Sequence, residues 1–306
     1  MSGARNTAER RTIATFPSHF ATREPGFYTH MFIEDITVGL MGFRYTEEAP
    51  KRGVALEGDE GGLAVLKGIC TSIADYPRHG IDETVESAIE SIGRRLAWYG
   101  KAVFEICVSG PEISLAPVVP FHLFRIPGGF VQVAPRVDYQ RGDGPRYAFL
   151  PSKNAWVVRI PRNLGGATAY RRLLDELTAV SKPAPEFWMR ELEAGKLSTQ
   201  FNASSYNRRR DAFVARLTRK WGWNRRDSSG INTTQIFYFY RSLRFRQAQA
   251  LLRDHIVDEL NSLARRLQII AKIRLKGFLS AAEIADLIKQ ALAGSLNYAK
   301  AWEKAR

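Results

Sequence analysis

The residues of this sequence best suited to chemistry are basic and aromatic, and they gather between positions 205 and 226. The stretch reads SYNRRRDAFVARLTRKWGWNRR. Guanidinium and ammonium groups neutralise phosphates, and planar rings stack on unpaired bases. We therefore predict a contact surface for nucleic acid or for a neighbouring protein subunit. Its candidate residues are Arg208, Arg209, Arg210, Arg219, Lys220, Arg225 and Arg226.

The aromatic residues of this stretch have a simpler interpretation as well. Phe213, Leu217 and Trp221 are spaced at i, i+4 and i+8, which places them on one face of a helix. A face of this kind usually packs into a core. We therefore expect the rings to be buried and the charges to form the contact surface.

The rest of the sequence offers little for catalysis or for metal binding. It contains neither a P-loop nor a dinucleotide-binding glycine motif. Neighbouring carboxylates such as Glu34 and Asp35 are expected on different faces of a helix. The five histidines are far apart, and Cys70 and Cys107 lack the spacing of metal ligands. We predict no enzyme activity, no cofactor and no metal site.

Composition points to an intracellular protein with a polyanionic partner. The chain has 306 residues, a net charge of +14 and a hydrophobic fraction of 45%, which is typical of a folded protein. Such a charge favours nucleic acid or an acidic protein surface as partner. We find no apolar run long enough to span a membrane and no signal peptide, so we expect a soluble protein without membrane contact.

Hydrophobic periodicity predicts an α+β protein. A helix is expected over 81–100, capped by Asp82, followed by strands at 101–109, 113–120 and 154–162 and a hairpin within 121–137. Residues 49–62 and 139–147 have the composition of loops. A helix over 165–181 completes this part.

Residues 231–276 contain neither Gly nor Pro, which predicts a helix of about forty residues. Ser280 and Glu283 form a capping box before a short terminal helix. The predicted organisation is a flexible basic arm (1–25), a mixed α+β domain (26–181), a helical region with the basic segment (182–276) and a C-terminal helix (277–306).

Trp98, Tyr99 and Gly100 form a corner between the helix at 81–100 and the strand that follows. Glycine accepts the left-handed conformation that ends a helix, and the two rings can fix the helix on the sheet. We therefore interpret this corner as structural.

The order of these parts resembles the portal proteins of tailed bacteriophages. LAWYGKAVFEI (96–106) is similar to their step from helix to strand, and LAPVVPFHLFRI (115–126) is similar to the apolar β-region that comes next. The segments at 154–177 and 233–267 resemble, respectively, a strand before a central helix and an aromatic entry into a long amphipathic helix. The resemblance covers roughly residues 60–270, and the chain is short for the family.

The resemblance implies a wing-like α+β domain followed by long helices. It also implies a homo-oligomeric ring, a dodecamer in the family pattern, that forms a channel for DNA packaging and ejection at a capsid vertex. Its partners would be DNA, the terminase, and capsid and connector or tail proteins, in the virion and in the host cytoplasm during assembly. The basic residues would then contact either DNA or carboxylates of a neighbouring subunit, such as those at 82–90.

Two alternatives remain open. The chain could be a monomeric nucleic-acid-binding protein that uses the basic segment directly. It could also be a phosphoryl or glycosyl enzyme that works without a metal and carries no familiar motif.

Overall fold

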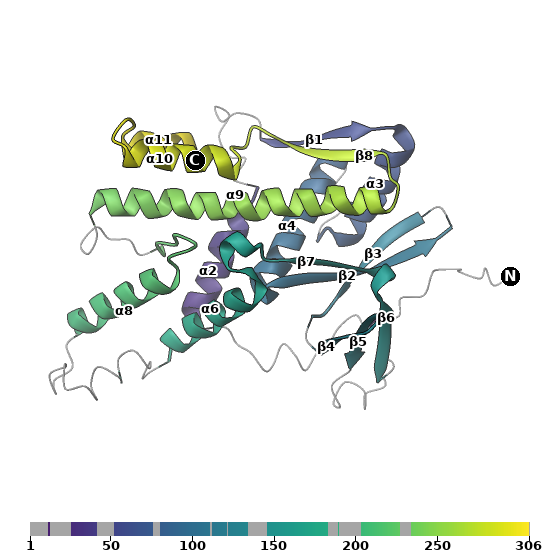
Figure 1. Cartoon of the computed structure of the whole chain (residues 1–306), viewed down its shortest axis with the longest axis horizontal. Helices are drawn as coiled ribbons and strands as arrows, with labels where there is room; N and C mark the ends of the chain where they lie inside the picture. Colours follow the sequence, from purple (N-terminus) through teal and green to yellow (C-terminus); the bar gives the residue numbers. More distant parts are fainter. Residues whose placement is uncertain are drawn as a thin grey trace. The chain divides into compact units, whose positions relative to one another are not determined.

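The computed structural model describes residues 12, 26–41, 52–75, 80–110, 112–120, 122–133, 146–182, 189, 203–226 and 234–305. These residues form both helices and strands, which confirms the α+β class predicted from the sequence. The chain divides into two compact units, and each unit is assembled from three separate stretches of sequence (Figure 1).

The first unit contains residues 1–24, 41–159 and 255–278. Its elements are β1 (Gly53–Gly58), α3 (Glu60–Ile73), α4 (Ile81–Tyr99), β2 (Lys101–Ser109), β3 (Glu112–Val118), β4 (Leu123–Ile126), β5 (Gly129–Val133), β6 (Tyr147–Pro151), the 3₁₀ turn η1 (Ser152–Asn154), β7 (Ala155–Arg159) and β8 (Ala271–Lys276). It also contains the last part of helix α9 (Gln235–Arg266), from His255 onward.

Strand β2 lies at the centre of a sheet in the order β3-β2-β7, with antiparallel pairing on both sides. This confirms the strands predicted at 101–109, 113–120 and 154–162. One face of β2 carries Phe104 and meets α4, where the Arg95 guanidinium lies 6.0 Å from the centre of the Phe104 ring. The opposite face carries Val103, which packs in an apolar cluster with Val118, Leu123 and Leu150. The cluster joins this sheet to the sheet of β4, β5 and β6.

The corner at residues 98–100 is a helix end, as the sequence predicts. Helix α4 ends at Tyr99, and Gly100 adopts the left-handed conformation with φ of 72°. The Gly100 N–H donates to the Leu96 carbonyl at 2.7 Å. Trp98 and Tyr99 are half-buried, and burial raises the pKa of the Tyr99 phenol. At the other end of α4 the capping prediction is wrong, because Gly80 rather than Asp82 is the N-cap.

The second sheet has the order β4-β5-β6 and is antiparallel throughout. It confirms the predicted hairpin, because Ile126 pairs with Gly129 and the chain turns through Gly128, whose φ is 82°. Tyr147, which was predicted as the last residue of a loop at 139–147, instead begins β6 and pairs with Val133. Pairing with β5 stabilises β6, and the sequence pattern within β6 alone does not reveal that pairing.

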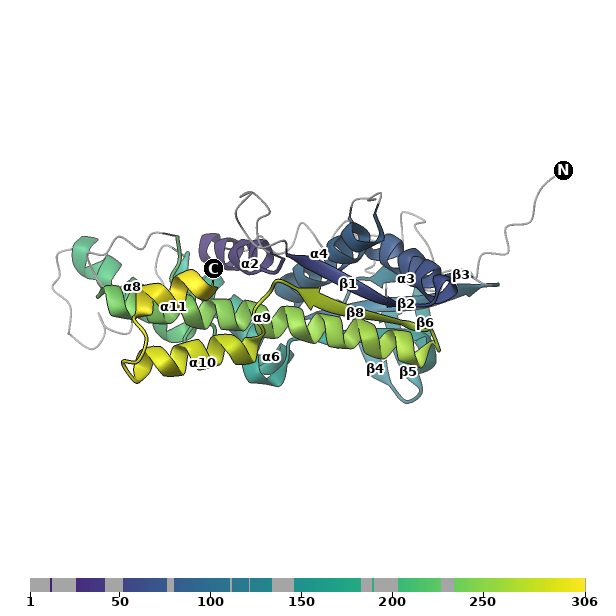
Figure 2. The same ribbon diagram turned by 90° about the horizontal axis from the view of Figure 1, so that it is seen from above.

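Two predictions are wrong at strands β1 and β8, which lie side by side in Figures 1 and 2. Residues 53–58 are a strand rather than a loop, and residues 271–276 are its antiparallel partner rather than the end of a helix. Helix α9 has 32 residues, about 48 Å, and ends at Arg266. Gln268 then takes a positive φ of 58°, which turns the chain toward β1. This pairing joins segments far apart in sequence, so local composition could not reveal it.

The second unit contains residues 25–40, 160–254 and 279–306. Its elements are α2 (Phe27–Val38), the 3₁₀ turn η2 (Arg162–Leu164), α6 (Gly166–Val180), α8 (Ala203–Leu217), α9 as far as Asp254, α10 (Ala281–Leu292) and α11 (Tyr298–Ala305). Leu243 and Ala250 of α9 pack against Ile284 and Ile288 of α10 and Ala301 of α11.

The C-terminal region contains two helices where the sequence predicts one over 277–306. The capping box before α10 is confirmed, because the Glu283 N–H donates to the Ser280 hydroxyl and the Ser280 N–H donates to the Glu283 carboxylate at 2.7 Å. The Ser280 backbone N–H and the Ser280 hydroxyl both donate to the Glu283 carboxylate, and these two hydrogen bonds lower its pKa. After α10 ends, Gly294 takes φ of 75° and the chain turns before α11.

The two units differ from the predicted division into 26–181, 182–276 and 277–306. Helix α2 belongs with α6 and the later helices, whereas β8 belongs with β1. Packing and strand pairing between distant segments set these boundaries, and changes in composition along the chain do not report them. Of the predicted arm at 1–25, only Thr12 is among the described residues.

The described helices include none that is long and apolar enough to cross a membrane. Cys70 and Cys107 are both free thiols. Cys70 is fully buried, and burial raises its pKa to about 12. It therefore packs as a small apolar side chain.

Candidate nucleic-acid or subunit interface

The basic segment consists of helix α8 and the turn that follows it, Thr218–Arg226. Val214 and Thr218 are buried, and the Thr218 hydroxyl donates to the Val214 carbonyl at 2.8 Å. The turn approaches α9 very closely at Gly222. A Cβ atom there would lie 2.4 Å from the Cβ of Arg244 and 2.6 Å from the carbonyl oxygen of Arg241. Gly222 also has φ of 74°, so only glycine fits this position without strain.

Trp221 and Trp223 are buried, as we expected for the rings of this segment, but both lie in the turn after α8 and not on its helical face. Each is 2% exposed, and their ring centres lie 5.5 Å and 5.1 Å from that of Phe32 on α2. The ring of Tyr170 on α6 lies 5.2 Å from that of Trp221. These rings are closed off from any base and instead fasten the turn to α2 and α6. Phe213 is half-buried, and the Arg216 guanidinium lies 5.3 Å from its ring centre.

A buried arginine that sequence reasoning missed holds the same turn from α9. Arg241 is 5% exposed, and its guanidinium donates to Asn224 Oδ1 at 3.1 Å, to Thr218 Oγ1 at 2.9 Å and to the carbonyls of Ala215 and Trp223. All four acceptors are neutral oxygens. Burial, together with the charge of Arg225, lowers the pKa of Arg241 to about 10. Nothing in the local pattern FYFYRSLRFR separates Arg241 from the half-buried arginines Arg244 and Arg246.

Three of the predicted contact residues form what we call the paired group: Arg210, Arg225 and Arg226. Arg210 and Arg225 both bond the Asp211 carboxylate. The Arg210 guanidinium also lies 5.6 Å from the ring centre of Tyr28, a buried residue of α2. These two arginines therefore share one acidic partner within their own chain, and that carboxylate offsets one of their two positive charges.

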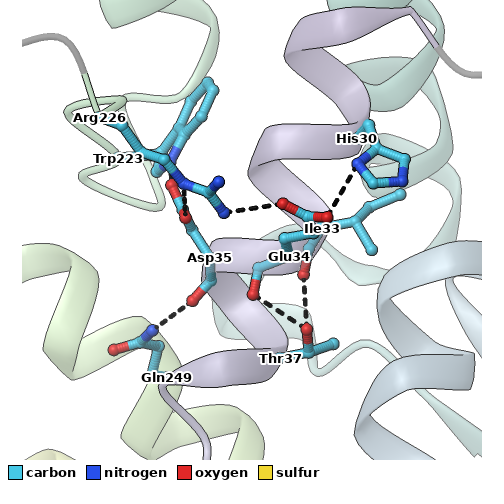
Figure 3. A network of polar contacts seen from close by, with 8 residues as sticks. All are labelled: His30, Ile33, Glu34, Asp35, Thr37, Trp223, Arg226 and Gln249. Carbon is cyan, nitrogen blue, oxygen red and sulfur yellow. Dashed lines mark hydrogen bonds and ion pairs between the residues drawn. The ribbon is translucent and has the colours of Figure 1, made fainter.

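Arg226 is held by the two carboxylates of α2 (Figure 3). Its Nε donates to Asp35 Oδ1 at 2.7 Å, and its terminal nitrogen donates to Glu34 Oε2 at 2.8 Å. The Trp223 indole donates to Asp35 Oδ2 at 2.8 Å. Glu34 and Asp35, which we expected on different faces of a helix, thus both reach the same guanidinium. Adjacent side chains on a helix are long enough to converge on one guanidinium.

The same network fixes α2 against α9. The Gln249 side chain donates to the Asp35 carbonyl at 2.8 Å, and the His30 ring contacts Glu34 at 3.1 Å. A Cβ atom at Gly39 would lie 1.8 Å from Gln249 Nε2, so glycine is what allows this close approach. The network in Figure 3 therefore reads as a structural clamp inside the second unit.

The remaining cations form what we call the open group: Arg208, Arg219 and Lys220. All three are exposed, and none has an acidic partner among the described residues. Arg209 is half-buried and makes contacts of its own, so we leave it out of this group. Only part of the predicted contact surface is therefore free to meet a partner.

Lys220 lies beside the start of helix α6. A Cβ atom at Gly165 would be 3.9 Å from Lys220 Nζ, and Gly165 is the N-cap of α6. The first turn of α6 contains no acidic residue, so the positive end of the helix adds to the lysine charge. An anion would be stabilised at this point of the open group.

The corner residues Trp98, Tyr99 and Gly100 belong to the first unit, and the basic segment belongs to the second. We therefore interpret the corner as a structural feature of the first unit, separate from the basic segment. Among the described residues, no cluster of histidine, cysteine or acidic side chains is arranged to hold a metal ion. Comparison of the chain with protein-family models, with curated proteins and with solved structures found no match.

Proposed function

We propose that this chain is a portal-like subunit, which assembles with copies of itself into a closed ring around a channel for DNA at a capsid vertex. The observation that carries the proposal is a pair of separate exposed apolar surfaces, one in each unit. A ring needs two surfaces, because each subunit joins one patch to a different patch of the next subunit. A symmetric dimer would need only one.

The first surface is the outer face of the sheet β4-β5-β6. Phe124 and Phe149 both lie opposite Val131, so all three share one row on one face. Ile126 follows Phe124 by two residues and Tyr147 precedes Phe149 by two residues, so both project from the same face. Phe124 is 57%, Tyr147 56% and Phe149 47% exposed. A cluster of aromatic side chains this exposed is typical of an interaction site.

The second surface lies at the start of α9 in the second unit, and a further exposed apolar side chain lies at the start of α2. Ile236 and Phe237 in the first turn of α9 are 61% and 42% exposed, and Phe27 at the start of α2 is 64% exposed. We propose that the sheet face of one subunit covers Ile236 and Phe237 of the next subunit. The work of such an assembly is geometric, and it requires no catalytic residue.

The open group has its own place in this proposal. A channel wall that lets DNA slide needs contacts with phosphates that do not depend on base sequence. Arg208, Arg219 and Lys220 supply such contacts, and the start of α6 adds a further positive charge. The terminase and the capsid and connector or tail proteins would be the other partners, in the virion and in the host cytoplasm during assembly.

The mass of the assembly tests the proposal. We expect light scattering of the full chain to show a single large species at micromolar concentration, and electron micrographs to show rings. In the double variant Phe124→Ser/Phe149→Ser, the protein concentration at which this species dissociates to monomer should rise about tenfold or more. Leu292→Ser is the control, because Leu292 is 63% exposed but lies on α10, outside both surfaces. A wild-type chain that remains monomeric across this range overturns the ring.

The second candidate function is a monomeric nucleic-acid-binding protein, which the open group favours independently. Its cations would contact phosphates without any assembly. A monomer that binds DNA with a steep salt dependence would support this candidate and exclude the ring.

A further inference from the structure

A carboxylate lies in the middle of the central strand of the first unit, where an apolar residue would be expected. Glu105 is 2% exposed, and its neighbours along β2 are the buried Phe104 and Ile106. An ionised carboxylate in such a place needs hydrogen-bond donors, because burial without them is very costly. The donors that reach Glu105 indicate what this position does.

Small residues flank the carboxylate within the sheet. Glu105 pairs with Ala116 on β3 and with Ala155 on β7. All three project from the face of the sheet opposite to Phe104. Two alanines beside a glutamate leave room for another side chain above the strand.

Thr12 takes that place. Its backbone N–H donates to Glu105 Oε2 at 2.9 Å, and its hydroxyl donates to the same oxygen at 2.7 Å. Thr12 is itself only 5% exposed, although it is 93 residues away in the sequence. Hydrogen bonds to an ionised acceptor are stronger than those between neutral groups, so the pair is a firm anchor.

We propose that Glu105 is a binding site for Thr12, and that it selects at this position a residue whose hydroxyl and backbone N–H can both donate to the carboxylate. Threonine and serine provide both donors in this arrangement. Valine has the shape of threonine and the same N–H, but it lacks the hydroxyl. Aspartate would bring a second negative charge against Glu105. The anchor is therefore chemical recognition and not only the filling of space.

Four variants at position 12 separate recognition from packing. Trypsin cleavage after Arg11 reports release of Thr12, because a docked peptide bond resists proteolysis. We expect Thr12→Val and Thr12→Asp to speed this cleavage about tenfold or more, the factor that loss of one hydrogen bond to a charged group produces. Thr12→Ser should be cleaved at nearly the wild-type rate, and Thr12→Ala should resemble valine. Equal rates for valine and threonine would overturn the proposal, because valine preserves the packing.

A second measurement does not depend on the folding of any core variant. A labelled peptide of residues 5–18 should bind the full-length Thr12→Val chain and be displaced by unlabelled peptide of the same sequence. The same peptide with valine in place of threonine should bind about tenfold more weakly. Equal binding of the two peptides would show that Glu105 does not recognise the hydroxyl. Both measurements are independent of ring assembly, so they stand whether or not the chain is portal-like.

Discussion

The paired group and the open group come from one stretch of sequence and each contains three cationic residues, yet their surroundings differ. Arg210, Arg225 and Arg226 meet carboxylates of their own chain. The open group has no acidic partner among the described residues. Net charge in a sequence therefore overstates the charge that a partner can meet. The paired cations belong to the fold, and the open cations remain for a function.

The difference has a physical origin in where each residue lies. Arg225 and Arg226 lie at the end of the turn, which packs against α2 and α9, so they come within reach of acidic side chains. Arg208 lies on α8, where it is exposed, and Arg219 and Lys220 are exposed in the first part of the turn. Three predictions test this contrast, beginning with the change that should have the largest effect.

Gly222→Ala should release the turn that positions the paired group. The new Cβ would clash with Arg244 and with the Arg241 carbonyl, and alanine is strained at φ of 74°. We expect the free energy of unfolding in urea to fall by about 3 kcal/mol or more. Gly294→Ala is the matched control, because its φ is 75° but no atom lies within 4 Å of the added Cβ. It should cost only the conformational strain of about 1 kcal/mol. Equal losses would mean that the turn does not approach α9 as described.

The paired group also shows how far sequence reasoning reaches. Helix α4, its end at Gly100, the strand β2 and the capping box at Ser280 all depend on residues close together in the chain, and their patterns predicted them. The burial of Trp221 was also predicted, although Trp221 lies in the turn after α8 and not on the helical face that suggested it. The partner of Arg226 could not be predicted from local patterns, because Asp35 lies 191 residues earlier. The pairing of β1 with β8 was missed for the same reason, and the two compact units also join segments that are far apart in the sequence.

Asp35→Ala tests the clamp on the paired group directly. The variant leaves the indole N–H of Trp223, a residue only 2% exposed, without its acceptor, and it removes one of the two carboxylates on Arg226. We expect a loss of about 2 kcal/mol in the free energy of unfolding. Asp286→Ala is the matched control, since Asp286 pairs with Lys289 where both side chains are more than half exposed. It should change stability by about 0.5 kcal/mol or less. If the two variants lose the same amount, the clamp adds nothing to the fold.

The smallest effect on stability should come from the open group, where the effect on binding decides the function. Replacement of Arg208, Arg219 and Lys220 by Gln removes exposed cations that make no ion pair among the described residues, so stability should stay within about 0.5 kcal/mol of wild type. Each phosphate contact on duplex DNA contributes about −0.9 to the slope of log K against log salt. The triple variant should therefore flatten that slope by up to about 2.7 units, with little dependence on DNA sequence.

A control with the same loss of charge separates contact from general attraction. Lys276, Lys300 and Lys304 are exposed and lie outside the basic segment, so their replacement by Gln should leave the slope nearly unchanged. If both triple variants flatten the slope equally, DNA is attracted only by net charge and the open group is no contact surface. If instead the open-group variant assembles poorly while its slope is unchanged, these cations pair with carboxylates of a neighbouring subunit. In that case the paired and open groups would differ only in whether the carboxylate comes from the same chain or from the next.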